Sequence, residues 1–143
     1  MTPGIRFTKF PSDEDMCILK VEICDGRSLF STEIYVGHTH LAETVSRLHE
    51  FKDQIYGGLF NLRFGEFGPE YASGALDVRM HFRKGAKIFL RVLAQSKFSH
   101  FEDWGASEAT LYLMSEPVLL DNFIFALRMM SEGSVDQADL EVI

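Results

Sequence analysis

Hydrophobic and polar residues alternate along several stretches of the chain, and this alternation predicts strands with one buried face. The first clear case is the stretch 17–24, in which Leu19 falls on one face and Lys20 on the other. Asp25-Gly26 follows, a pair typical of tight hairpin turns. We therefore expect a second strand to return alongside the first over residues 28–36.

The second half of the chain contains further stretches with strand character. Residues 74–83 and 87–95 alternate over their whole lengths and are separated by a short turn. A shorter run at 59–64 and a later one at 108–114 complete the set. The expected buried face of the sheet consists of Leu19, Val21, Leu76, Val78, Leu90 and Val92.

Two segments have the spacing of helices. Apolar residues recur every three or four positions over residues 39–56, with Thr39 as the capping residue. A second helix is expected to be capped by Ser115 and to carry Pro117 in its first turn, where a missing N–H costs no hydrogen bond. Its body, residues 118–130, is apolar almost all round. Such a helix is either buried in the core or in contact with a partner, for example a second copy of the chain.

These elements predict one α+β domain over residues 1–143. The order is ββαββββα, and short connections between consecutive strands favour a mainly antiparallel sheet of about six strands. Both helices are expected to pack on one face of this sheet. The end segments 1–15 and 134–143 are expected to be loose, because the first is mixed and polar and the second is acidic.

The composition of the chain argues against several classes of protein. There are 21 acidic and 14 basic residues, for a net charge of −7. This balance argues against a nucleic-acid-binding protein, which needs clustered Lys and Arg. No apolar run approaches the roughly 18 residues of a membrane span, and the N-terminus lacks the apolar stretch of a signal peptide. Cys17 and Cys24 fall on opposite faces of a strand, so free thiols and a cytoplasmic location are expected.

Candidate catalytic and metal-binding groups are few. His38 and His40 lie at the start of the first predicted helix and His49 lies further along it, but His40 and His49 would point in opposite directions. No second cluster of ligands occurs at metal-site spacing. Nucleophile motifs and phosphate-binding loops are also missing from the sequence. We therefore expect no catalytic residue, no metal and no cofactor.

A strip of basic and aromatic side chains is the first candidate for a binding function. It should lie on the outer face of two neighbouring strands and consists of Arg79, His81, Arg83, Phe89 and Arg91. Arginine and aromatic residues are enriched at protein interfaces, so the strip would suit an acidic partner or a second copy of the chain. The alternative is a solvated face whose charge is balanced by Asp77, Glu22 and Glu33.

The loop 96–107 is the second candidate. It contains His100, Glu102, Asp103 and Trp104. A carboxylate buried beside Trp104 would have a raised pKa and could act as a general acid. In the alternative interpretation, Trp104 anchors the loop on the core and its neighbours face water.

The second half of the chain resembles a group of small bacterial α+β proteins, some of which are immunity partners of secreted toxins. The resemblance rests on the strand pair 74–94, Trp104-Gly105-Ala106, the strand 109–114 and the helix opened by Ser115-Glu116-Pro117. It implies an immunity-like protein-binding domain without catalytic residues. Together with the basic strip and the apolar helix, which suit a protein partner or a homodimer, and with the lack of a membrane-spanning run, it leads us to expect a non-enzymatic protein-binding domain with no membrane partner. The alternative function is a small-molecule-binding or enzymatic domain that uses a pocket near the loop 96–107.

Overall fold

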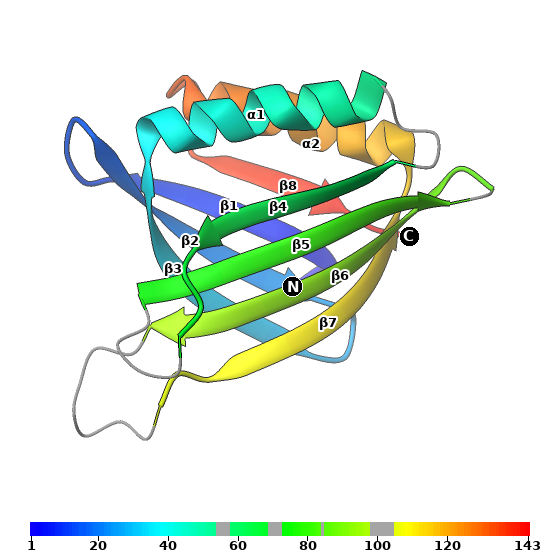
Figure 1. The fold of residues 1–143 in the computed structure, drawn as a ribbon, viewed down its shortest axis with the longest axis horizontal. Helices are drawn as coiled ribbons and strands as arrows, with labels where there is room; N and C mark the ends of the chain where they lie inside the picture. The colour runs from blue at the N-terminus through cyan, green and yellow to red at the C-terminus, as the bar shows by residue number, and fades with distance from the viewer. Residues whose placement is uncertain (54–57, 69–72, 84, 98–104) are drawn as a thin grey trace.

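A computed structural model describes residues 1–53, 58–68, 73–83, 85–97 and 105–143. Within these residues the chain forms two helices and two antiparallel sheets of four strands each (Figure 1). The elements are β1 (Gly4–Pro11), β2 (Met16–Cys24), β3 (Leu29–Gly37), α1 (His38–Asp53), β4 (Leu59–Gly65), β5 (Ser73–Arg83), β6 (Lys87–Lys97), β7 (Glu108–Ser115), α2 (Pro117–Ser131) and β8 (Gln137–Glu141).

The first sheet combines the two ends of the chain. Its strand order is β3-β2-β1-β8, so the last strand pairs with the first. Ile5 of β1 lies opposite Ile23 of β2 on one side and Leu140 of β8 on the other. These side chains are 0–1% exposed, because alternate residues of all four strands turn toward the interior.

The second sheet contains four strands that follow one another in the sequence, in the order β4-β5-β6-β7. Val78 of β5 lies opposite Leu62 of β4 and Val92 of β6. All three side chains are buried. The six residues predicted for the buried face, which belong to both sheets, are likewise buried: Leu19, Val21, Leu76, Val78, Leu90 and Val92.

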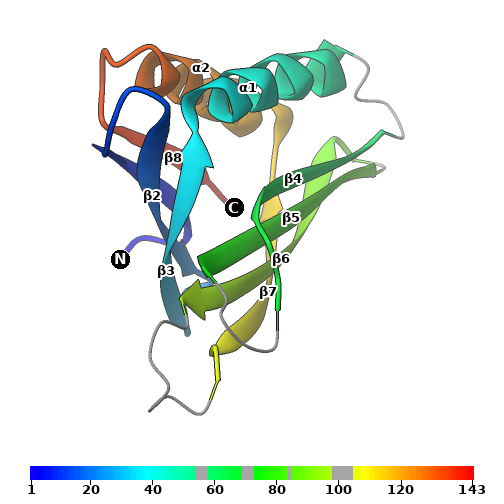
Figure 2. The ribbon, with the colours of Figure 1, turned by 60° about the vertical axis from the view of Figure 1, so that its left-hand side comes forward.

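The two sheets face each other and come closest where β3 crosses β5 and β6 (Figure 2). At this crossing, the buried hydroxyl of Thr32 donates a hydrogen bond to the carbonyl oxygen of Gln95 at 2.9 Å. Gly74 of β5 lies so close to the carbonyl oxygen of Glu33 that a Cβ atom there would overlap it. Gly74 has φ +88°, a conformation that also favours glycine.

The helices lie together across the other end of the two sheets (Figure 2). Phe7 of β1 contacts both Phe64 of β4 and Phe123 of α2, with ring centroids 6.2 and 5.6 Å apart. The three rings are fully buried, so one aromatic cluster joins both sheets and α2. Lys52 of α1 forms an ion pair with Asp121 of α2 on the surface above it.

Helix α2 buries one face and exposes the other, although its sequence is almost wholly apolar. Leu120, Phe123, Ile124, Leu127 and Met130 are buried, whereas Val118 and Phe125 are 60% and 57% exposed. The helix ends in a Schellman motif, because the N–H of Ser134 donates to Met129 and the N–H of Gly133 to Met130. One face of α2 is therefore buried in the core, as one of the two alternatives predicted, and the other face lies at the surface.

The structure corrects several expectations. The prediction of about six strands in one sheet is only roughly right, because the described residues form eight strands in two sheets. The segments 1–15 and 134–143 were expected to be loose, yet they contain β1 and β8, each with alternate side chains buried. Pro117 does open α2, but the predicted cap Ser115 belongs to β7 and donates its hydroxyl to the carbonyl oxygen of Glu141 at 2.7 Å.

Helix α1 begins at His38, directly after β3 and one residue before the predicted cap Thr39. The N–H of His38 donates to the carbonyl oxygen of Asp15 at 2.9 Å. The helix is described as far as Asp53, and residues 54–57, which the prediction included in part, lie outside the described residues. Cys17 and Cys24 are both free, as the sequence predicted, and both are buried.

Candidate functional site

The predicted basic strip lies on the outer face of the second sheet. Arg79 of β5 lies directly opposite Arg91 of β6, and His81 lies opposite Phe89. On the far side of β6, Tyr112 of β7 lies opposite Arg91 and is 71% exposed. We call this surface the basic–aromatic face and define it by Arg79, His81, Arg83, Phe89, Arg91 and Tyr112.

The basic–aromatic face is hollowed. These six side chains, with Leu90 and Leu113, line a depression of about 310 Å³. The pattern of the sequence identified five of the six residues. Tyr112 was missed because the connection between β6 and β7 is long, so no tight turn sets the register of these two strands.

Arg83, His81 and Phe89 contact one another within this face. The Nε–H of Arg83 donates to Nδ1 of His81 at 3.3 Å, and the guanidinium carbon of Arg83 lies 4.9 Å from the centre of the Phe89 ring. The cation–π contact and the hydrogen bond hold Arg83 across the hairpin. In this hydrogen bond Nδ1 of His81 is the acceptor.

The positive charges of Arg79 and Arg91 are not neutralised by an acidic side chain of the described structure. Like charges directly opposite one another on neighbouring strands are unfavourable. Within the described part of the chain, neither guanidinium has an acidic group at ion-pair distance. The nearby carboxylates are engaged elsewhere: Asp77 pairs with Arg63 at 3.3 Å and Glu116 with Lys87 at 3.4 Å.

The alternative of a charge-balanced solvated face is therefore weakened. Asp77 lies on the same face, but its ion pair is with Arg63. Glu22 and Glu33 belong to β2 and β3 of the first sheet and do not approach Arg79 or Arg91 at ion-pair distance. The face thus carries positive charge on a chain whose net charge is −7.

The other predicted site residues are not brought together by the described structure. His100, Glu102, Asp103 and Trp104 lie outside the described residues. His38 and His40 contact backbone carbonyl oxygens, of Asp13 and Arg63 respectively, both at 3.1 Å. Among the residues described, no group of three or more His, Cys, Asp or Glu side chains is placed to hold a metal ion.

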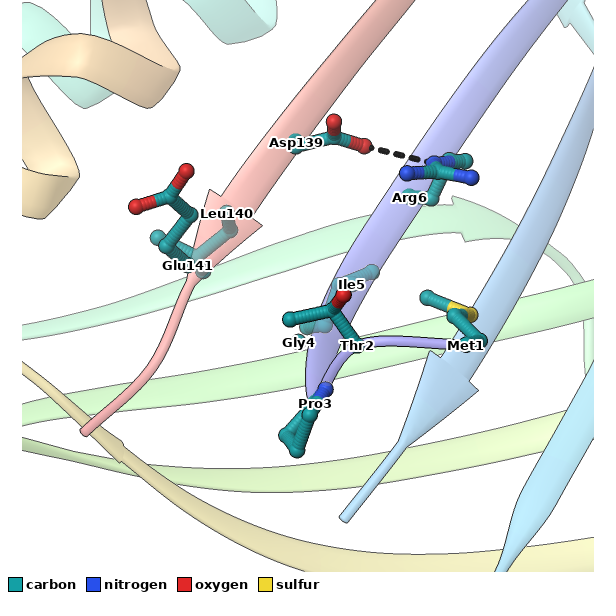
Figure 3. A pocket seen from close by; sticks show the side chains of 9 residues that line it. All are labelled: Met1, Thr2, Pro3, Gly4, Ile5, Arg6, Asp139, Leu140 and Glu141. Carbon is teal, nitrogen blue, oxygen red and sulfur yellow. Dashed lines mark hydrogen bonds and ion pairs between the residues drawn. The ribbon is translucent and has the colours of Figure 1, made fainter. Parts of the chain in front are cut away.

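A smaller pocket of about 120 Å³ lies where the beginning of β1 meets β8 (Figure 3). Arg6 and Asp139 point toward each other across its rim, and Nε of Arg6 lies 2.9 Å from Oδ1 of Asp139. This contact raises the pKa of Arg6 through the hydrogen bond and the charge of Asp139. Because the two charged groups satisfy each other, the pocket offers less to a charged ligand than the basic–aromatic face does.

No protein-family model, curated protein or solved structure matches this chain. Neither helix among the described residues has the length and apolar character that a membrane-crossing helix needs.

Proposed function

We propose that this chain is a non-enzymatic protein-binding domain that recognises an acidic protein surface through its basic–aromatic face. The single observation that carries the proposal is the cross-strand pair Arg79 and Arg91. Two like charges opposite each other cost stability in the free protein, and a partner's carboxylates would remove this cost on binding.

The aromatic side chains of the face support the same function. Phe89 and Tyr112 are 39% and 71% exposed beside the arginines. Tyr and Arg are the residue types that most often dominate the binding energy of protein interfaces, because each combines a large contact area with a polar end. The depression of about 310 Å³ between them would receive one or two partner side chains.

The proposal agrees with one further observation and with one expectation from the sequence. Both cysteines are free, which suits a partner met in a reducing compartment. The resemblance of the second half of the chain to immunity proteins also favours an inhibitor that acts by binding, although an acidic partner of another kind would use the same chemistry.

The experiment measures binding to poly-L-glutamate, an acidic polypeptide without a fixed fold, by isothermal titration calorimetry. We expect binding that weakens as salt rises, because it depends on charge. The double variant R79Q/R91Q should bind at least about tenfold more weakly, since two arginines each supply a charge-assisted contact.

The matched control is K20Q/R47Q, which removes the same charge from the outer face of β2 and from α1. It should bind as the wild type does. Equal losses in the two double variants would mean that net charge alone matters, and the proposed face would be wrong. Tighter binding to a short DNA duplex than to poly-L-glutamate would overturn the choice of a protein partner.

A further inference from the structure

The exposed edge of β7 borders the basic–aromatic face, and its backbone geometry can be assigned. The carbonyl oxygen of Met114 accepts a hydrogen bond from the N–H of Ile143 at 2.8 Å, so Met114 points away from β6. At the other end, the N–H of Ser96 donates to the carbonyl oxygen of Ser107, so Ser107 points toward β6. Backbone direction alternates along an antiparallel strand. The backbone groups of Thr110 and Tyr112 therefore point outward.

These outward groups have no partner in the described structure. Among the described strands, β7 lies at the edge of the second sheet and pairs only with β6. Beyond the bond between Met114 and Ile143, no described group bonds to the outer side of β7. Thr110 and Tyr112 thus present two N–H and two C=O groups with which a fifth strand could pair.

Each of the other three edge strands packs against an element outside its own sheet: β4 against α1, β8 against α2, and β3 against β5 and β6. On β4, the carbonyl oxygen of Arg63 is engaged by His40 of α1. On β8, the carbonyl oxygen of Glu141 is engaged by Ser115. The edge strand β3 lies against the second sheet, where Thr32 bonds to β6.

Proteins usually protect a free edge with proline, charge, a bulge or a short strand. The strand β7 has eight residues, pairs with β6 in an unbroken register, and carries a charge only at Glu108. A regular edge of this length with a single charged residue at one end is suited to pairing with another strand.

A second hollow lies beside the end of β7. It has a volume of about 470 Å³, and its lining residues include Phe89, Tyr112, Met114, Pro3, Val142 and Ile143. Several of these side chains are apolar, so the hollow would hold an apolar side chain from a strand that ends beside Met114.

From this geometry we propose that the acidic partner binds by adding an extended segment to the edge of β7. The inference rests on the proposed function and specifies how the partner is recognised. Backbone hydrogen bonds to Thr110 and Tyr112 would supply affinity, and alternate side chains of the added strand would face the same side as Arg91. An added strand would lie about 10 Å from β6, within the combined reach of an arginine and a glutamate.

The test uses a capped eight-residue peptide that begins with phenylalanine and then alternates threonine with glutamate, so that the phenylalanine and the glutamates share one face. Binding should slow amide hydrogen exchange at Thr110 and Tyr112 by at least about tenfold, because their N–H groups become hydrogen-bonded. The same peptide with N-methyl groups on the amides that face β7 keeps its charge but cannot pair. It should bind at least about tenfold more weakly.

A variant of the protein tests the same bonds from the other side. T110P removes an outward N–H, a position where an edge strand tolerates proline, and should abolish slowed exchange at Tyr112. T110V keeps the N–H and should bind the peptide as the wild type does. If T110P does not fold, the N-methylated peptide still decides the question.

The possible results separate the two proposals. Equal binding of both peptides, with unchanged exchange at Thr110 and Tyr112, would overturn strand addition while R79Q/R91Q could still support the basic–aromatic face. No binding of the peptide would also overturn strand addition. If R79Q/R91Q and K20Q/R47Q bind poly-L-glutamate with equal affinity, the proposed function itself would be overturned. Slowed exchange at Thr110 that depends on protein concentration without peptide would assign the edge to a second copy of the chain and overturn the inference.

Discussion

The hydroxyl of Thr32 donates a hydrogen bond to the carbonyl oxygen of Gln95 at 2.9 Å, and this bond joins an edge strand of one sheet to an inner strand of the other. Thr32 is 5% exposed, so water cannot readily replace the hydroxyl. The bond fixes the point at which the two sheets cross.

The substitution T32V should lower the free energy of unfolding by about 1–2 kcal/mol, because a buried carbonyl oxygen loses its donor. Urea denaturation measures the change. T44V is the matched control, since Thr44 is 6% exposed and its hydroxyl bonds only within α1, to His40. A local bond of that kind adds little to a helix, so T44V should cost less. Equal costs would show that the bond between the sheets has no special weight.

Gly74 should not tolerate a side chain. G74A would combine a strained φ, which costs about 1–2 kcal/mol for alanine, with overlap between Cβ and the carbonyl oxygen of Glu33. We expect a total loss of at least about 3 kcal/mol or failure to fold. G133A is the control, because Gly133 has φ +86° but nothing within 4 Å of its Cβ position. It should lose only the strain, and thermal denaturation of the two variants compares them.

Replacing Arg91 and Arg63 by glutamine should change stability in opposite directions, because Arg91 has no acidic partner among the described residues and Arg63 pairs with Asp77. R91Q relieves the repulsion from Arg79 and should raise the free energy of unfolding by about 0.2–1 kcal/mol. R63Q removes the partner of Asp77, whose Oδ1 is already buried with no hydrogen-bond partner among the described residues, and should cost about 1 kcal/mol. Stability curves in urea at low salt measure both. A loss in R91Q would contradict the unbalanced charge on which the proposed function depends.

Burial raises the pKa of the Cys17 thiol. An acidic group whose pKa is raised by folding holds its proton longer in the folded state than in the unfolded state. Stability should therefore fall as pH rises above the unfolded value of about 8.5. The wild type should lose more stability between about pH 8 and 10 than C17A, which lacks this thiol. Parallel pH profiles would contradict the prediction.

Alternation and turn chemistry were enough to place most strands. Residues 17–24 and 28–36 were predicted within one residue of β2 and β3, and Asp25-Gly26 forms the turn between them. The carboxylate of Asp25 accepts bonds from the N–H groups of Ser28 and Arg27, at 2.7 and 2.8 Å, and these bonds lower its pKa. Residues close together in the sequence determine such a hairpin, so it can be predicted from a short stretch of sequence.

The division into two sheets could not be read in the same way. It depends on the pairing of β1 with β8, which are separated by most of the chain. The five residues of β8 include Asp139 and Glu141, whose charges gave the segment the composition of a loose tail. Its two inward residues, Ala138 and Leu140, were too few to establish a period.

The sequence predicted the part of the basic–aromatic face that lies on the hairpin formed by β5 and β6. Arg79 and Arg91 could be placed side by side because β5 and β6 are joined by a short turn, which sets their register. Tyr112 and the free edge of β7 depend on a longer connection and on the strand order of the whole sheet. A surface built by three strands is visible only once their order is known.

The pairing of β1 with β8 also has a consequence for biosynthesis. Strands β4 to β7 occupy one continuous part of the chain and can pair as soon as residue 115 has left the ribosome. The strand β1 is made first, but one of its two sides finds its neighbour only when residues 137–141 emerge. Until then the nascent chain exposes the open side of β1, so the interval between the start and the end of translation is when this protein most needs protection from aggregation.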